Sequence, residues 1–232
     1  MEQIIRTGVI KAQLCDVFQE QLNYFFVGRP AYKARHDDDE GAFWELPVCF
    51  VFQFDVTNSK RIYPFDTGAF EREKFPQFIQ MMDREDFEIG AVINGPEKYI
   101  GTFFGTPSKY FKMEPIDESK LQSRYSLGVF DAEIQALHRL VIRPGPKIGD
   151  TRVDDRRSTI EVQFDKDRVL LKKDLLAVIM PEPYFLEPEV TKYFESLGAD
   201  IISYQTFPQN PTLYYAVIYE KIGEFFRAKK LI

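Results

Sequence analysis

The sequence has few cysteines and no long hydrophobic run. Cys15 and Cys49 are the two cysteines among 232 residues. Two thiols cannot build a disulfide framework, so we expect them to be reduced, as in a cytoplasmic protein. No apolar run approaches the roughly 18 residues that a membrane span needs. The first residues, MEQIIRTGVIKAQ, are too polar for a signal peptide, so we expect a cytoplasmic protein without membrane contact.

Several common cofactor and nucleophile motifs are also absent. There is no G-x-G-x-x-G, no G-x-x-x-x-G-K-[ST] and no G-x-S-x-G, which argues against a Rossmann turn, a P-loop and a hydrolase elbow. His36 and His138 are the two histidines, and neither belongs to a metal-type motif. His138 falls in a predicted helix, where a structural role is favoured. Cys49 falls in an apolar strand, which raises the pKa of a thiol and makes it a poor nucleophile.

Acidic residues outnumber basic residues in this sequence. The net charge is −6, which argues against broad nucleic-acid binding through bulk charge. The chain is nevertheless rich in apolar side chains: 44% of residues are hydrophobic and 15% are aromatic, including 22 Phe and 12 Tyr. Such a composition predicts a folded chain with packed strands. The length suits one domain that covers residues 1–232.

Strand and helix patterns alternate without a regular β-α-β rhythm, which favours an α+β fold with a split, mostly antiparallel sheet flanked by helices. The segment VTNSK (56–60) has turn composition and predicts a hairpin between the strands on either side of it. The predicted strands are 23–27, 47–54, 61–65, 158–164, 176–180 and 201–206. The predicted helices are 3–6, a segment that begins near Phe70 behind a cap at Asp66 and Thr67, 96–104, 131–142, 188–197 and 212–227.

An acidic run, HDDDE (36–40), lies in a predicted loop. Carboxylates are the ligands of hard divalent cations, but such ions need several oxygens that converge on one point. A contiguous acidic run on a loop seldom provides this by itself. The pattern therefore favours a solvated loop, and we predict no metal site.

Two segments stand out as candidates for function. The run FFVGRPAY (25–32) ends a predicted strand with an arginine, Arg29, between a glycine and a proline. In STIEVQF (158–164), alternation places Thr159, Glu161 and Gln163 on one face of a strand. Glutamate is depleted in strands. The competing interpretations are an exposed polar strand face for Glu161, and for Arg29 an ion pair with a nearby carboxylate such as that of Asp37 or Asp39.

The order of these segments resembles the ADP-ribosyltransferases, most closely the DNA-targeting toxins of DarT type. The phrase IIRTGVI (4–10) is similar to that family's I-L/I-x-x-G-L/I helix. NYFFVGRPAY is similar to its F-Y-F-x-P-R strand, with Pro and Arg in the opposite order, and STIEVQF…LLAVIMP is similar to its Q-A-E-F-L-V region. The resemblance covers residues 4–32 and 152–181.

The resemblance implies an NAD-dependent transferase of the toxin or defence-factor type, with Glu161 as the catalytic glutamate and Arg29 as an NAD-contacting residue. The other residues that it places around NAD are Tyr24, Phe26, Gly28, Thr159 and Gln163. The chemistry suits these types, because cleavage of the nicotinamide–ribose bond builds positive charge that a carboxylate stabilises. An arginine grips phosphate with two hydrogen bonds. The acceptor, nucleic acid or protein, and the oligomeric state stay open.

One departure weakens the resemblance. The family carries a histidine-bearing first strand before the I-I-x-x-G-I helix, and this sequence begins at that helix. The first alternative is therefore a non-catalytic binding module on the same fold. The second is a metal-dependent nuclease built from Asp154, Asp155, Glu161 and Gln163. The transferase hypothesis predicts that Arg29 and Glu161 face one cleft.

Overall fold

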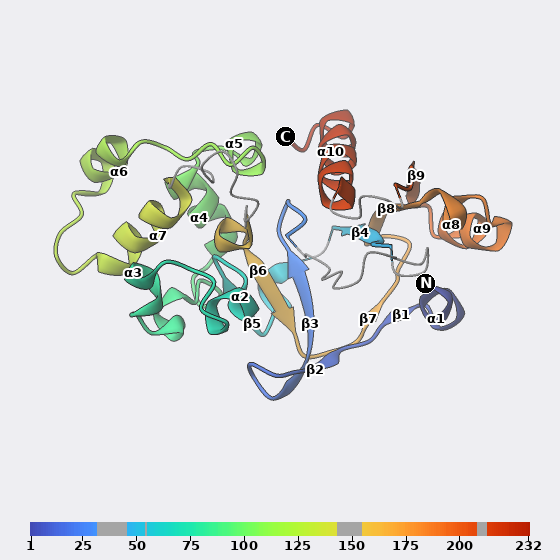
Figure 1. Cartoon of the computed structure of the whole chain (residues 1–232), viewed down its shortest axis with the longest axis horizontal. Helices are drawn as coiled ribbons and strands as arrows, with labels where there is room; N and C mark the ends of the chain where they lie inside the picture. Colours follow the sequence, from blue (N-terminus) through green and yellow to red (C-terminus); the bar gives the residue numbers. More distant parts are fainter. Residues whose placement is uncertain (32–45, 54, 143–154, 208–212) are drawn as a thin grey trace. The chain divides into compact units, whose positions relative to one another are not determined.

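A computed structural model describes residues 1–31, 46–53, 55–142, 155–207 and 213–232 (Figure 1). The chain divides into two compact units. Unit 1 consists of Met1–Gln13, Tyr32–Val56 and Lys166–Leu231, and unit 2 consists mainly of Leu14–Ala31 and Thr57–Asp165. Each unit is described by itself below. The expectation of one domain over residues 1–232 stays a prediction.

Unit 1 is built around a three-stranded sheet of order β4-β8-β9. Strand β8 (Leu175–Pro181) pairs antiparallel with β4 (Cys49–Phe52) and parallel with β9 (Asp200–Tyr204). A parallel pair needs a crossover connection, which α8 (Glu182–Phe185) and α9 (Pro188–Ser196) supply. Because both faces of β8 are covered, nearly all of its residues are buried.

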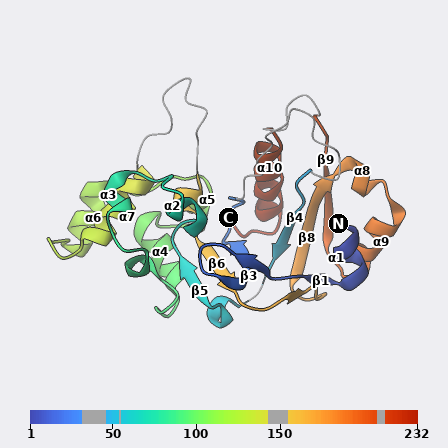
Figure 2. The same ribbon diagram turned by 60° about the horizontal axis from the view of Figure 1, so that its bottom comes forward.

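The core of unit 1 lies between β8 and α9, where Val178 and Met180 pack with Val190 and Phe194. Ile4 and Ile5 of α1 (Glu2–Thr7) complete this cluster. Figures 1 and 2 show α10 (Leu213–Ala228) on the other side of the sheet. Strands β1 (Val9–Ile10) and β7 (Arg168–Val169) form a short antiparallel pair.

Unit 2 contains a four-stranded sheet of order β2-β3-β6-β5. Its strands are β2 (Gln13–Cys15), β3 (Glu20–Phe26), β6 (Glu161–Phe164) and β5 (Arg61–Tyr63). Strand β6 is central and pairs antiparallel with both β3 and β5. Segments that are far apart in the sequence of unit 2 thus meet at β6, because residues near 162 pair with residues near 25 on one side and near 62 on the other.

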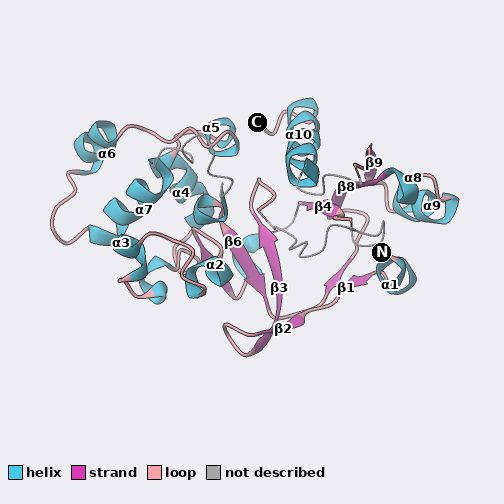
Figure 3. Ribbon diagram, viewed as in Figure 1, coloured by secondary structure: helices cyan, strands magenta, loops and turns pink. Residues whose placement is uncertain are grey.

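Helices make up the rest of unit 2 and gather on one side of its sheet in both ribbon views (Figures 2 and 3). Phe65 anchors their packing: its ring stacks on Phe70 at 5.3 Å between centroids and meets Phe75 and Phe87 edge-on. The α-helices are α2 (Thr67–Glu71), α3 (Gln77–Gln80), α4 (Gly95–Phe103), α5 (Pro107–Phe111), α6 (Glu118–Tyr125) and α7 (Ala132–Ile142). The 3₁₀ turns are η2 (Val56–Asn58), η3 (Arg84–Phe87) and η4 (Asp155–Ser158).

The predicted α+β class, with largely antiparallel pairing, agrees with the structure. The predicted cap also holds: Asp66 accepts a hydrogen bond from the Ala69 amide at 2.7 Å, at the start of α2. The hairpin across VTNSK is wrong, because β4 pairs with β8 while β5 pairs with β6. The predicted strand 158–164 begins only at Glu161, since the chain up to Ser158 is a 3₁₀ turn.

Both cysteines lie in the part of the chain that the structure describes. Cys49 lies in β4, where desolvation raises the pKa of its thiol to about 12, as expected for a packed cysteine. Cys15 accepts a hydrogen bond from the Tyr24 hydroxyl at 2.6 Å. Across the part of the chain that the structure describes, no helix combines the length and apolar character of a membrane span.

Two glycines of α4 give a paired test of the packing in unit 2. A Cβ on Gly95 would lie 2.1 Å from the Ile89 carbonyl oxygen, whereas a Cβ on Gly101 meets nothing within 4 Å. We expect Gly95→Ala to destabilise unit 2 by about 1–3 kcal/mol, because backbone must move. We expect Gly101→Ala to stabilise it by about 0.5–1 kcal/mol, because alanine is the better helix former. Urea unfolding of both variants measures this, and equal effects would contradict the packing at Gly95.

Candidate functional site

The pairing of β3 with β6 brings the two predicted site segments together. Phe26 lies opposite Glu161, and Tyr24 lies opposite Gln163. Directly opposed residues of an antiparallel pair share a face of the sheet, so these four side chains belong to one face. Arg29 follows three residues after Phe26, at the end where β6 begins. Residues about 130 positions apart in sequence therefore meet at one end of a strand pair.

Arg29 is a buried side chain, 2% exposed. One terminal nitrogen, Nη1, donates to the carbonyl oxygen of Tyr110 at 3.1 Å. The other, Nη2, donates to Ser158 Oγ at 3.2 Å and to Thr159 Oγ1. The guanidinium carbon also lies 4.8 Å from the centre of the Tyr110 ring, within the range of a cation–π interaction. Arg29 thus ties the end of β3 to α5 and to the chain that enters β6.

Tyr110 joins the same two strands through its hydroxyl group. The hydroxyl donates to the Val27 carbonyl at 3.0 Å and accepts from the Ile160 amide at 3.0 Å. The Val27 amide in turn donates to the Ile160 carbonyl at 2.9 Å. The side chain of one α5 residue therefore extends the β3–β6 ladder beyond its last regular pair. It also fixes the ring on which the Arg29 guanidinium rests.

Glu161 is the first residue of β6 and is also 2% exposed. Its Oε1 accepts hydrogen bonds from the Thr67 hydroxyl and from Gln163 Nε2, both at 2.7 Å. Its Oε2 accepts from the Thr67 amide at 3.2 Å. Thr67 begins α2, so the carboxylate sits at a helix start, where amide groups point outward. Both oxygens of Glu161 are thus held by protein groups.

The environment of Glu161 raises the pKa of its carboxyl group to about 7. Burial is the largest cause, because it disfavours the charged form, and the nearby Asp66 carboxylate adds to it. The hydrogen bonds from Gln163 and Thr67 act in the opposite direction. Glu161 therefore changes charge near neutral pH, while ordinary glutamates do so near pH 4.5.

The polar contacts continue from Gln163 to the edge of the sheet. Gln163 Oε1 lies 3.4 Å from Arg61 Nη1 on the adjacent strand β5. Arg61 also pairs with Glu20, with Nη2 to Oε1 at 3.0 Å and Nη1 to Oε2 at 3.2 Å. The Lys60 ammonium pairs with Glu20 as well, at 2.5 Å. These two cations hold the pKa of Glu20 down to about 2.

The predicted site residues divide into three groups. Glu161 and Gln163 share one face of β6 as expected, whereas Thr159 precedes the strand and binds Arg29 together with Ser158. Tyr24 and Phe26 stand opposite Gln163 and Glu161, but the Tyr24 hydroxyl is engaged with Cys15. Gly28 has a φ of 65°, and an added Cβ would lie 3.4 Å from the Tyr110 ring. The role of Gly28 here is to let β3 end against Tyr110.

The exposed-polar-face interpretation of Glu161 is wrong, since Thr159, Glu161 and Gln163 are all buried. The reason is that β6 is the central strand, with α2 against the carboxylate. Asp37, Asp39, the acidic run 36–40 and Asp154 lie outside the described residues. Within the described ranges, no cluster of three or more potential metal ligands is found. The nuclease alternative stays untested, because Asp154 is not among the described residues.

The surroundings of Arg29 and Glu161 show whether these two residues fit NAD. The residue types suit it, with an arginine for phosphate and a carboxylate for the ribose. Their burial does not suit NAD, because the side chains of Arg29 and Glu161 are each only 2% exposed. Arg29 donates from both terminal nitrogens to protein oxygens, and Glu161 accepts on both oxygens from protein donors. As placed here, the two residues do not fit the cofactor.

Sequence reasoning missed the two residues that organise this region, Tyr110 and Ser158. Tyr110 lies in SKYFK (108–112), which carries no signal for a contact with residues near 27 and 160. The sequence indicates Thr67 as part of a helix cap, whereas in the structure Thr67 also supplies two donors to Glu161. His138 is buried, with Nε2 2.8 Å from the Ile116 carbonyl, as expected for a structural histidine.

Comparisons with protein-family models, with curated proteins and with solved structures found no match to this chain.

Proposed function

We propose that this chain is a non-catalytic binding protein on the plan of the ADP-ribosyltransferases, in which Arg29 and Glu161 are internal groups of the fold. One observation carries the proposal: both side chains are 2% exposed and their charged atoms bind protein groups. A cofactor would have to displace Thr67, Gln163, Ser158 and Thr159 before it reached either charge. Each buried group left unpaired by such a displacement costs about 1–3 kcal/mol.

Titration calorimetry with NAD tests this proposal directly. We expect no saturable heat with NAD at concentrations up to about 1 mM, because Arg29 and Glu161 are each 2% exposed and bind protein groups. AMP serves as the control for binding through the adenine half alone. Saturable NAD binding that Glu161→Gln weakens at least about tenfold would contradict the proposal.

The second candidate is an active NAD-dependent ADP-ribosyltransferase. One observation favours it: Arg29 binds Thr159, which lies only two residues before Glu161 in the sequence. Thr67 and Gln163 also fix the orientation of the carboxylate. This candidate requires that substrate can reach both groups. It predicts nicotinamide release that depends on Glu161, whereas the binding protein releases none.

A further inference from the structure

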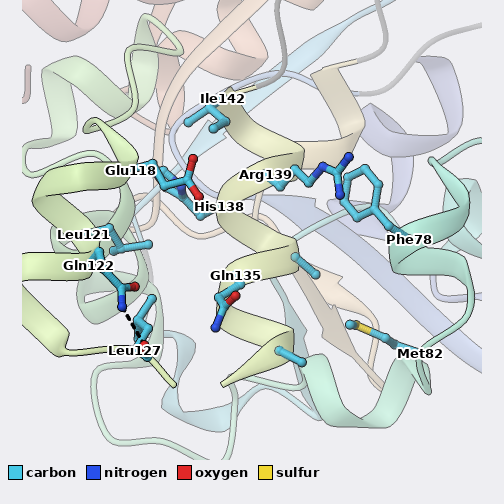
Figure 4. A pocket seen from close by; sticks show the side chains of 12 residues that line it. Phe78, Met82, Glu118, Leu121, Gln122, Leu127, Gln135, His138, Arg139 and Ile142 are labelled. Carbon is cyan, nitrogen blue, oxygen red and sulfur yellow. Dashed lines mark hydrogen bonds between the residues drawn. The ribbon is translucent and has the colours of Figure 1, made fainter. Parts of the chain in front are cut away.

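A hollow lies between α3, α6 and α7 in unit 2 (Figure 4). It encloses about 570 Å³, a volume within the roughly 300–1,000 Å³ of small-molecule sites. Each of the three helices contributes an apolar side chain to its lining, namely Phe78, Leu121 and Ala136, and polar side chains complete the lining. A mixed lining of this kind suits a small molecule that is itself partly polar and partly apolar.

Arg139 of α7 is the arginine that lines this hollow. Its guanidinium carbon lies 4.6 Å from the centre of the Phe78 ring, within the range of a cation–π interaction. Figure 4 shows the two side chains next to each other. Among the residues that the structure describes, no acidic side chain forms an ion pair with Arg139. The ring therefore holds a cation at the hollow, and no carboxylate of the described residues neutralises it.

Two other arginines of unit 2 show how a carboxylate completes such an arrangement. Arg61 and Arg84 each lie with the guanidinium carbon 4.4 Å from the centre of the Phe18 ring. Arg61 also pairs with Glu20, and Arg84 also pairs with Glu71. The face of the guanidinium contacts a ring in both cases, while its nitrogens bind an acid. At the hollow, a bound molecule can supply that acid.

The charges of the lining indicate which acid fits. Apart from His138, whose Nε2 lies 2.8 Å from the Ile116 carbonyl oxygen, the lining contains one base, Arg139, and one acid, Glu118. In Figure 4, Glu118 and Arg139 lie on opposite sides of α7. One guanidinium binds one carboxylate through two parallel hydrogen bonds. A phosphate ester carries up to about two negative charges, more than a single base offsets. The lining therefore favours a monoanion.

We propose that this hollow binds a small monocarboxylate with an apolar body. The carboxylate pairs with the guanidinium of Arg139, and the body lies against the apolar side chains that include Phe78 and Leu121. The hollow then supplies both parts of a small-molecule site: an apolar surface for area and one polar group for orientation. The proposal uses neither Arg29 nor Glu161, so it does not depend on the function proposed above.

Titration of the isotope-labelled full chain with phenylacetate, followed by nuclear magnetic resonance, tests the proposal. We expect saturable shifts with a Kd of about 0.1–1 mM, as for other ligands of this size. The shifts should include the Nε–Hε signal of Arg139. Phenylacetamide has the same apolar body without the charge, so it should bind at least about tenfold more weakly.

Three variants make the result specific to the hollow. Arg139→Gln removes the cation and should weaken phenylacetate binding at least about tenfold. Arg139→Lys keeps the charge without the planar fork and should weaken binding less. Arg124→Gln is the matched control: Arg124 is exposed and lies 5.3 Å from the Tyr125 ring, but it does not line the hollow. This control should leave binding unchanged.

The same spectra show whether each variant is folded, because a folded chain gives dispersed signals. The proposal would be overturned if phenylacetate gave no saturable shift up to about 10 mM. Equal binding of phenylacetamide would also overturn it, because the carboxylate would then contribute nothing. An effect of Arg124→Gln as large as that of Arg139→Gln would do the same, since it would show a general dependence on charge.

Discussion

Arg29→Ala is expected to destabilise unit 2 by about 3–5 kcal/mol. The change removes the donor for the Tyr110 carbonyl and for the hydroxyl groups of Ser158 and Thr159, in a region from which water is excluded. It also removes the cation that rests on the Tyr110 ring. Urea unfolding at pH 7 measures the loss as a change in midpoint.

Two further variants make this result specific. Arg29→Lys keeps the charge but loses the planar fork, so it should cost less than Arg29→Ala but still more than about 1 kcal/mol. Arg72→Ala removes an exposed arginine at the end of α2 and should change stability by less than about 0.5 kcal/mol. If Arg29→Ala behaved like Arg72→Ala, Arg29 would not be a structural group.

Stability is expected to fall as pH rises from 4.5 to 7, and Glu161→Gln is expected to remove that fall. The folded state raises the pKa of Glu161 from 4.5 to about 7, so the folded chain holds a proton that the unfolded chain has already lost. Below pH 4.5 both states are protonated and the burial of Glu161 has no ionisation cost. The cost grows with pH and levels off above pH 7, at about 3 kcal/mol.

The decisive readout is the difference in slope between wild type and Glu161→Gln. Glutamine does not titrate, so the wild-type curve should drop relative to the variant between pH 4.5 and 7, whatever constant offset the new amide introduces. Glu20 acts in the opposite sense: its pKa is lowered to about 2, so its contribution is lost only as pH falls below about 4.5. Parallel curves from pH 4.5 to 7 would show that Glu161 is not buried as described.

Local signals in the sequence were reliable where neighbouring residues decide the structure. The cap at Asp66, the helix predicted at 3–6 and the shared face of Glu161 and Gln163 all follow from short-range chemistry. Alternation places Glu161 and Gln163 on one face of β6, and the pairing of β3 with β6 brings Arg29 near the start of that strand.

Long-range pairing explains what the sequence could not predict. The turn composition of VTNSK is compatible with a hairpin, but β6 supplies a better partner for β5 from about 100 residues away. The burial of Glu161 also depends on long-range packing. A glutamate in a strand is buried only if another element packs over it, and here α2 packs over Glu161. The contact of Tyr110 with Arg29 depends on where α5 lies, and no local pattern in the sequence encodes that.

Nicotinamide release from NAD by the purified chain tests the central claim most directly, namely that Arg29 and Glu161 are internal structural groups. The account predicts that wild type and Glu161→Gln both release nicotinamide only at the rate of a protein-free control, at pH 6 and at pH 8. Release by the wild type that Glu161→Gln abolishes, with the variant still folded, would contradict the claim and establish Glu161 as a catalytic residue.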